Sequence, residues 1–136
     1  MYQEELAKLK CIKQEYNEML PNPVEESEVH ALSIKFKDEF GTVLPIDYYE
    51  FLKQCDGVEF NGCIIYGSKD LLECQLDYEY ITEKYIVFAE YDIGWFCMNK
   101  IDRGFYELDK PSGSKMRSFE SMENMIKYVL QLSVEL

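Results

Sequence analysis

Residues 44–67 read LPIDYYEFLKQCDGVEFNGCIIYG, and this stretch holds the signals that decide the fold. Pro45 is acceptable in the first turn of a helix, so a short helix is expected after it. The apolar face of that helix is formed by Tyr48, Phe51 and Leu52. Asp56-Gly57 should end it, and Asn61-Gly62 is the dipeptide typical of a tight hairpin turn. The stretch therefore predicts a helix followed by two short strands, at residues 58–60 and 63–66.

Upstream of this stretch, the sequence predicts two further helices. Residues 2–20 place apolar side chains at steps of three and four, which is the helical period. These side chains are Leu6, Leu9, Ile12, Tyr16 and Met19. Pro21 and Pro23 are expected to stop this helix because proline lacks the amide donor. A second helix is expected from about Glu25, with Gly41 as its C-cap.

Downstream, the pattern changes from helical to extended. Ser68 is expected to cap one helical turn through Leu72, and residues 73–84 show no clear period, so no element is predicted there. Strands are predicted at residues 85–91, 95–99, 105–108 and 115–117, with turns between them. Ser118 is expected to cap a last helix. The order predicts a single α+β domain: N-terminal helices, an antiparallel-rich sheet meander and a closing C-terminal helix packed on it.

Composition excludes several classes of protein. The chain has 136 residues, 47% of them hydrophobic, and a formal net charge of −12. This is the composition of one globular domain and not of a disordered chain. Net negative charge argues against binding to nucleic acid or an anionic membrane, and it favours a basic protein partner. Residues 41–85 carry nine acidic residues against three lysines, although an acidic surface can also simply confer solubility.

The N-terminal sequence and the cysteines predict a cytoplasmic protein. Residues 1–10 lack the apolar region of a signal peptide, and no apolar run approaches the roughly 18 residues that a membrane span needs. The five cysteines form no CxxC pair, so reduced thiols are expected.

Catalytic and metal-binding patterns are weak. His30 is the one histidine, and a structural or surface role is favoured for it because no nucleophile motif accompanies it. Cys55, Cys63 and Cys74 could join His30 in a zinc site, but their spacing matches no known finger, and buried small hydrophobes are the better interpretation. Phosphate-binding loops are absent, and carboxylate pairs arise by chance among 26 acids. We therefore predict no enzyme activity, no cofactor and no metal.

Residues 44–67 resemble the signature of the SUKH superfamily. The shared features are Leu44-Pro45, the aromatic-rich helix, the Asp-Gly and Asn-Gly dipeptides and the hairpin. The resemblance extends over residues 25–132, including the strand that contains Trp95. It implies that Tyr48, Phe51 and Leu52 pack the core and that Gly57 holds the turn. Asp56 stands where asparagine is frequent in that superfamily. The helix within residues 1–20 is an addition to the minimal signature of that superfamily. Residues 1–136 as a whole are expected to form one SUKH-like domain.

The resemblance implies an immunity protein that binds and neutralises a polymorphic toxin, often a nuclease. Other members, including fungal regulators of cell-wall synthesis, are interaction proteins, so a regulatory scaffold is the alternative. Neither class implies catalysis, and the protein could be a monomer or a homodimer. An acidic surface could occupy the basic cleft of a nuclease by mimicking phosphate.

The predicted contact surface combines acids with tyrosines on turns and irregular segments, because tyrosine gives large, rigid contact area. Its members are Asp56, Glu59, Asp70, Glu73, Asp77, Tyr78, Glu79, Tyr80 and Asp92. Tyr85 and Tyr91 lie in the same acidic region, but packing on the sheet is the alternative for both.

Overall fold

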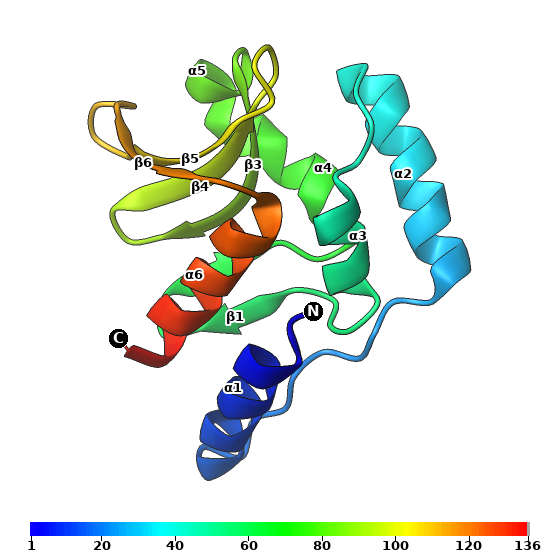
Figure 1. Cartoon of the computed structure of the whole chain (residues 1–136), viewed down its shortest axis with the longest axis vertical. Coiled ribbons are helices and arrows are strands. Elements are labelled where there is room, and N and C mark those ends of the chain that lie inside the picture. Colours follow the sequence, from blue (N-terminus) through cyan, green and yellow to red (C-terminus); the bar gives the residue numbers. More distant parts are fainter. Residues whose placement is uncertain (136) are drawn as a thin grey trace.

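The computed structural model describes residues 1–135, apart from the side chains of Glu79 and Tyr80. Its centre is a six-stranded antiparallel sheet in which the strands lie in the same order as in the chain (Figure 1). The strands are β1 (Val58–Phe60), β2 (Cys63–Ile65), β3 (Tyr85–Tyr91), β4 (Gly94–Asn99), β5 (Phe105–Asp109) and β6 (Lys115–Phe119). With helices before and after the sheet, the predicted single α+β domain and its meander are confirmed.

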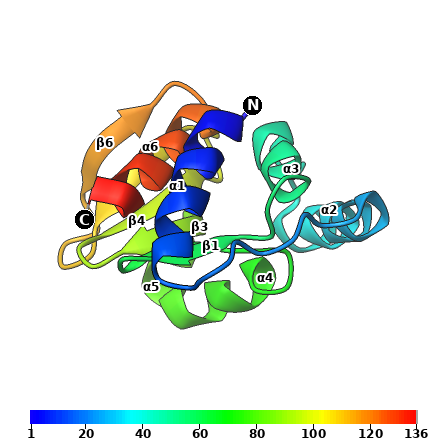
Figure 2. The ribbon, with the colours of Figure 1, turned by 90° about the horizontal axis from the view of Figure 1, so that it is seen from below.

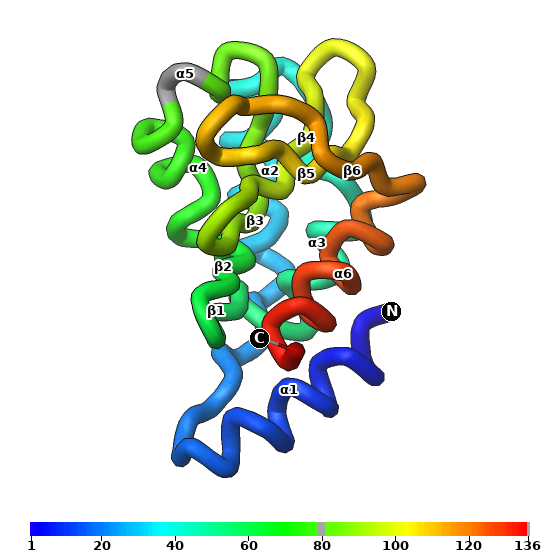
Figure 3. The backbone as a smooth tube through the Cα atoms, turned by 90° about the vertical axis from the view of Figure 1, so that its left-hand side faces the viewer, coloured from blue at the N-terminus to red at the C-terminus, as the bar shows by residue number. Residues whose placement is uncertain are grey.

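Helices cover both faces of the sheet. The longer ones are α1 (Gln3–Glu15), α2 (Glu26–Phe40), α3 (Ile46–Leu52) and α6 (Met122–Glu135). A short irregular stretch consists of α4 (Leu71–Cys74), a 3₁₀ turn at Gln75–Tyr78 and α5 (Glu79–Thr82). Seen from below, α1 and α6 lie on one face of the sheet and α4 and α5 on the other, with α2 and α3 to the side (Figure 2). Figure 3 shows α6 running directly above α1.

The glycine signals in the sequence are confirmed. Gly41 follows α2 with a φ of 68°, and its N–H donates to the carbonyl of Lys37, as expected for a left-handed C-cap. At the hairpin turn, Asn61 and Gly62 have φ values of 51° and 81°. Two positive φ angles are what a type I′ turn requires. The β1–β2 hairpin is therefore fixed by its own turn residues.

The first helix is shorter than predicted. It ends at Glu15 and not at the prolines, and Asn17 already has a left-handed φ of 59°. As a result only the first part of the expected apolar stripe is buried: Leu6 and Leu9 are buried, whereas Tyr16 is 66% exposed and Met19 is 84% exposed. The predicted N-terminal helix is therefore present, but its predicted end is wrong, and Tyr16 and Met19 do not join the core.

The main core lies between the sheet and α1, α2, α3 and α6. Its largest fully buried side chains are Tyr2, Phe36, Tyr48, Phe51, Phe88 and Phe96. Phe88 sits at a β-bulge, because the register between β3 and β4 shifts between Val87 and Ala89. The extra residue lets both Phe88 and Ala89 join the main core. The bulge thus explains why β3 is buried without a clean alternation.

A second, smaller core lies on the other face of the sheet, under the short helices. It contains Ile81, Val87, Trp95, Cys97 and Leu108. The side-chain amide of Gln75 donates from Nε2 to the carbonyl of Val87 (2.7 Å), and the N–H of Val87 donates to Oε1 (2.9 Å). These two bonds satisfy the backbone of β3 beyond the end of β2. They hold the irregular stretch on the sheet.

Two capping predictions are wrong. Ser68 does not cap a turn through Leu72: α4 begins only at Leu71, and residues 73–84, for which no element was predicted, are largely helical. Ser118 lies inside β6, and the cap of α6 is Ser121, whose hydroxyl accepts the N–H of Asn124 at 3.1 Å. The Asp47 carboxylate also accepts an N–H in the first turn of α6, from Glu123 at 3.0 Å. A carboxylate there is favourable because the helix N-terminus is positive.

Candidate protein-binding surface

Three of the predicted contact residues line one groove. Asp56 precedes β1, Glu59 lies on β1 and Asp70 immediately precedes α4. Together with Pro21 and Ile64 they border a cavity of about 320 Å³. Glu59 and Asp70 are exposed, while Asp56 is half-buried. The fold therefore brings three carboxylates from two segments of the chain, the start of β1 and the start of α4, to the same place.

Asp56 and Gly57 form the backbone junction beneath this groove. The Asp56 carboxylate accepts the N–H of Ser68 at 2.7 Å, which fixes the turn after β2. Gly57 has a φ of +87°, and a Cβ there would lie 2.8 Å from the backbone nitrogen of Gly67 and from the carbonyl oxygen of Ile65. Only glycine fits this approach. One oxygen of Asp56 is therefore committed to the fold.

The other residues of the SUKH-like signature lie in or next to the core. Pro45 is the N-cap of α3, with extended backbone angles. The remaining side chains are buried: Leu44, Tyr48, Phe51, Leu52 and Trp95. These five buried side chains are thus unable to contact a partner directly.

Acidic residues on this side of the molecule raise the pKa values of two buried groups, Cys74 and Tyr48, and Asp70 contributes to both. Burial is the main cause that raises the pKa of the Cys74 thiol to about 12, and the carboxylates of Glu90, Asp77 and Asp70 raise it further. The pKa of Tyr48 is raised by burial first, and also by Asp56 and Asp70. Because a carboxylate shifts a pKa only at short range, these acids lie around one region of the molecule. Glu73 is exposed on α4, next to them in the chain.

Tyr78 is anchored to the sheet. Its ring packs edge-on against Trp95, with the centroids 5.6 Å apart. Its hydroxyl lies 2.6 Å from the hydroxyl of Tyr66, and both donate to the carboxylate of Glu90. Glu90 also lies 3.4 Å from the ammonium of Lys110. Glu90 is not among the contact residues predicted from the sequence. The one sequence signal for it is that it is the only acidic residue in the strand YIVFAEY.

The remaining predicted contacts are placed differently. Asp92 is exposed in the β3–β4 turn, and a Cβ on Gly62 would lie 3.3 Å from its Oδ1, so this carboxylate borders the hairpin turn. The side chains of Glu79 and Tyr80 lie outside the described part of the structure. Tyr91 stacks on Phe96 at 5.6 Å, which supports the packing interpretation for that residue.

The structure gives the candidate zinc ligands separate surroundings. Cys55, Cys63 and Cys74 are buried, whereas His30 is exposed on α2. Among the described residues, no three His, Cys, Asp or Glu side chains are grouped closely enough to hold a metal ion. Within residues 1–135, no helix combines the length and the apolar character required to cross a bilayer.

The thiols yield a direct chemical prediction. Burial raises the pKa of Cys63 to about 11 and that of Cys55 and Cys74 to about 12. Burial also raises the pKa of Cys97. Thiolate, the reactive form, is therefore scarce at these four sites at pH 8, while Cys11 is exposed. Iodoacetamide should add rapidly to one cysteine in the native protein and to all five in denaturant, as read by intact mass. Rapid addition to two or more native cysteines would contradict the buried placement.

Comparison with known proteins supports the resemblance drawn from residues 44–67. Residues 30–127, from the first turns of α2 to the middle of α6, match the model of the SMI1 / KNR4 family (SUKH-1). No curated protein sequence matches the chain significantly. The matched residues include the aromatic helix, the hairpin and the whole sheet, so SUKH membership is confirmed. The protein belongs to the SMI1/KNR4 (SUKH-1) family, which comprises immunity and regulatory protein-interaction domains that are generally non-catalytic.

Proposed function

We propose that this protein is a non-catalytic immunity protein that binds and neutralises a cognate toxin with a basic surface. The contact is made by the acidic face, defined here as Asp56, Glu59, Asp70, Glu73 and Asp77. The observation that carries the proposal is that Asp56, Glu59 and Asp70 border one solvent-facing cavity of about 320 Å³. Tyr78, Glu79, Tyr80 and Asp92 remain predicted contacts at its margins.

Charge explains how such a face would work. A chain with a net charge of −12 attracts a basic partner over long distances, which speeds association. A nuclease toxin needs a positive cleft for its substrate, and carboxylates placed like phosphates can occupy that cleft. Binding then blocks the substrate without any chemistry by the immunity protein. Inhibition inside the producing cell requires this protein in the cytoplasm.

Charge reversal on the acidic face tests the proposal. Replacing Asp70 and Asp77 together with lysine should weaken toxin binding by at least tenfold at low salt, or about 1.4 kcal/mol. Because two attractive charges become repulsive, the affinity should also depend less steeply on salt concentration. Both side chains are exposed, so folding should be unaffected. Titration calorimetry at several salt concentrations measures both effects.

A matched control separates local contact from overall charge. Glu4 on α1 and Glu120 before α6 are also exposed, but they lie with the helices that cover the other face of the sheet. Their double lysine variant has the same net charge as the test variant and should bind nearly as tightly as wild type. Equal weakening by both pairs, or by neither, would show that the acidic face is not the contact.

A regulatory scaffold is the second candidate, because the matched family includes regulatory interaction domains as well as immunity proteins. The two differ in where the gene lies. An immunity gene directly follows the gene of its toxin, whereas the gene of a scaffold need not have a toxin neighbour. For either function, we propose that residues 25–132 form the family core and that residues 1–20 are an addition to it.

A further inference from the structure

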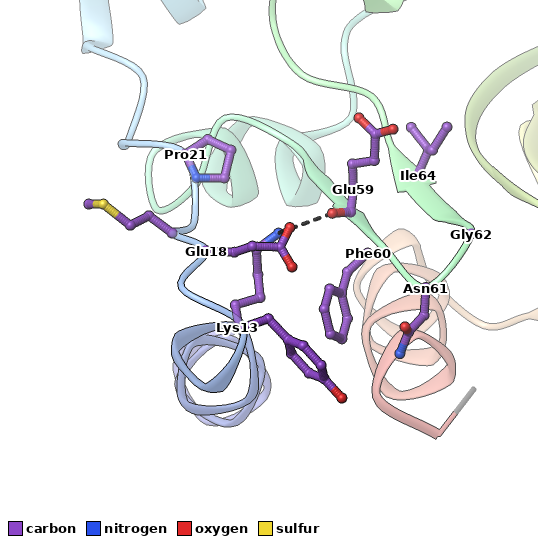
Figure 4. A pocket seen from close by; sticks show the side chains of 10 residues that line it. Lys13, Glu18, Pro21, Glu59, Phe60, Asn61, Gly62 and Ile64 are labelled. Carbon is purple, nitrogen blue, oxygen red and sulfur yellow. Dashed lines mark hydrogen bonds and ion pairs between the residues drawn. The ribbon is translucent and has the colours of Figure 1, made fainter.

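A second groove, larger than the first, lies between α1 and the β1–β2 hairpin. It has a volume of about 650 Å³ and is open to solvent. Figure 4 shows Glu18, Glu59 and Phe60 around it, with the hairpin turn Asn61-Gly62 at one side. Tyr16 and Met19, which follow the end of α1, complete the wall. The groove therefore exists because α1 ends at Glu15 and the chain leaves the core there.

The floor of the groove is built by a buried lysine. Lys13 is only 5% exposed, its ammonium lies 5.3 Å from the centroid of Phe60, and it donates to the carbonyl of Glu59 at 3.0 Å. Phe60 and Cys63 flank the two-residue turn and form the hydrogen-bonded pair next to it. In an antiparallel pair the next residues, here Glu59 and Ile64, are not hydrogen-bonded to each other, so the backbone N–H and C=O of Glu59 point away from β2, toward the edge of the sheet. The Lys13 ammonium thus hydrogen-bonds to the outward-facing carbonyl of Glu59 on edge strand β1. A ligand would consequently be held by side chains and not by adding a strand.

The walls of the groove combine apolar and acidic side chains. Met19 is 84% exposed and Tyr16 is 66% exposed, with the Tyr16 ring 6.1 Å from that of Phe60. Glu18 and Glu59 are exposed carboxylates on either side. Glu18 lies 4.0 Å from the ammonium of Lys13, which is already hydrogen-bonded to Glu59. The accessible charge is negative beside an exposed apolar surface.

This groove continues into the acidic face. The 320 Å³ cavity that Asp56 and Asp70 border shares Pro21, Glu59 and Ile64 with the larger groove. Both follow the same edge strand, β1, so carboxylates line one path from Glu18 to Asp70. An extended chain could follow this path. Positive side chains would complement it, and a large apolar side chain would cover Tyr16 and Met19.

We infer that the groove receives an extended segment of the partner toxin that carries basic residues and a large apolar residue. The inference rests on the proposed function and names the part of the surface that selects the partner. Residues 16–21 lie outside the segment matched by the family model, 30–127. This wall is therefore supplied by the N-terminal addition and distinguishes the chain from the shared family core.

The first experiment uses a peptide and needs no toxin. Ac-RLRLR-amide, which alternates basic and large apolar residues, is added at millimolar concentration to ¹⁵N-labelled protein. Backbone amide signals of residues 16–20 and 59–64 should shift together and saturate. The same titration with Ac-ELELE-amide should leave them unmoved, because its charges repel Glu18 and Glu59. Shifts that spare these residues, or no shifts, would overturn the inference.

The second experiment uses the toxin domain encoded beside the gene. Replacing Tyr16 and Met19 together with serine should weaken binding at least tenfold while leaving its salt dependence unchanged, because no charge is altered. Glu18→Gln should instead reduce the salt dependence. The control variant replaces Ile34 and Ile101 with serine; these side chains are also exposed, at 53% and 88%, but they do not line the groove.

The outcomes separate this inference from the proposed function. If wild type binds the toxin and the Tyr16/Met19 variant binds equally well, the groove is not the selecting site, although the proposed function stands. If wild type does not bind the toxin while the peptide shifts map to residues 16–20 and 59–64, the groove stands and the proposed partner is wrong.

Discussion

Replacing Phe88 with alanine is expected to lower the free energy of unfolding by about 4 kcal/mol. Phe88 is 1% exposed and occupies the bulge in β3. Its ring lies 5.1 Å from that of Tyr48 on α3 and 6.1 Å from that of Phe36 on α2. Removing the ring leaves a cavity where two helices meet the sheet, and the surrounding aromatic rings are too rigid to fill it. The loss is large against the 5–15 kcal/mol that stabilises a typical domain.

Urea unfolding followed by circular dichroism measures this loss, and Ile101→Ala is the control. Ile101 is 88% exposed in a turn, so its truncation should change the free energy of unfolding by less than about 0.5 kcal/mol. A loss below about 1.5 kcal/mol for Phe88→Ala would mean that this side chain does not join α2 and α3 to the sheet.

Replacing Gly57 with alanine is expected to cost about 3 kcal/mol. Two effects add: the residue would hold a left-handed φ of +87°, and its Cβ would lie 2.8 Å from the backbone of both Gly67 and Ile65. The contacted atoms belong to the backbone, so no side chain can rotate away. The change should also displace the Asp56 carboxylate from the N–H of Ser68 and so disturb the first groove.

Gly113→Ala isolates the first of these effects, the strain of a positive φ. Gly113 also has a positive φ, +71°, but a Cβ there would meet nothing within 4 Å. Its substitution should therefore cost only the conformational strain, about 1 kcal/mol. Equal losses at the two glycines in thermal or urea unfolding would show that the close approach of Gly57 to residues 65–67 is absent.

Local signals made much of the fold predictable. Asn61-Gly62 determines its turn through its own backbone preferences, and Gly41 does the same for the end of α2. The closing amphipathic helix carries a period that one core face imposes, and the long strand of residues 85–91 is marked by its extended pattern of aromatic and β-branched residues. Such features need no knowledge of the rest of the chain.

Features that depend on tertiary contacts were not predictable. The helices of residues 71–82 are too short to show a period, and Gln75 holds them by bonding to the backbone of Val87, twelve residues away. The bulge at Phe88 exists only in relation to β4. The end of α1 is also not predictable, because Tyr16 and Met19 continue the spacing of the buried Leu6 and Leu9 in the sequence but are exposed in the fold.

The candidate site was predictable only in part. Acidity and turn position selected Asp56, Glu59 and Asp70, which the fold does bring to one groove. Tyr78 was selected as an exposed aromatic residue, yet its hydroxyl is held by Glu90 and its ring by Trp95. The larger groove was not foreseen, because it requires residues 16–21 and 59–64 to meet in space.

Co-expression with the toxin domain encoded next to the gene tests the central claim most directly. Cells producing an active toxin should survive when this protein is present, and the two proteins should co-purify as a stable 1:1 complex. The Asp70/Asp77 lysine variant should lose protection, and the Glu4/Glu120 variant should retain it. Cell death together with no complex, for a toxin proven active, would contradict the claim and favour the regulatory scaffold.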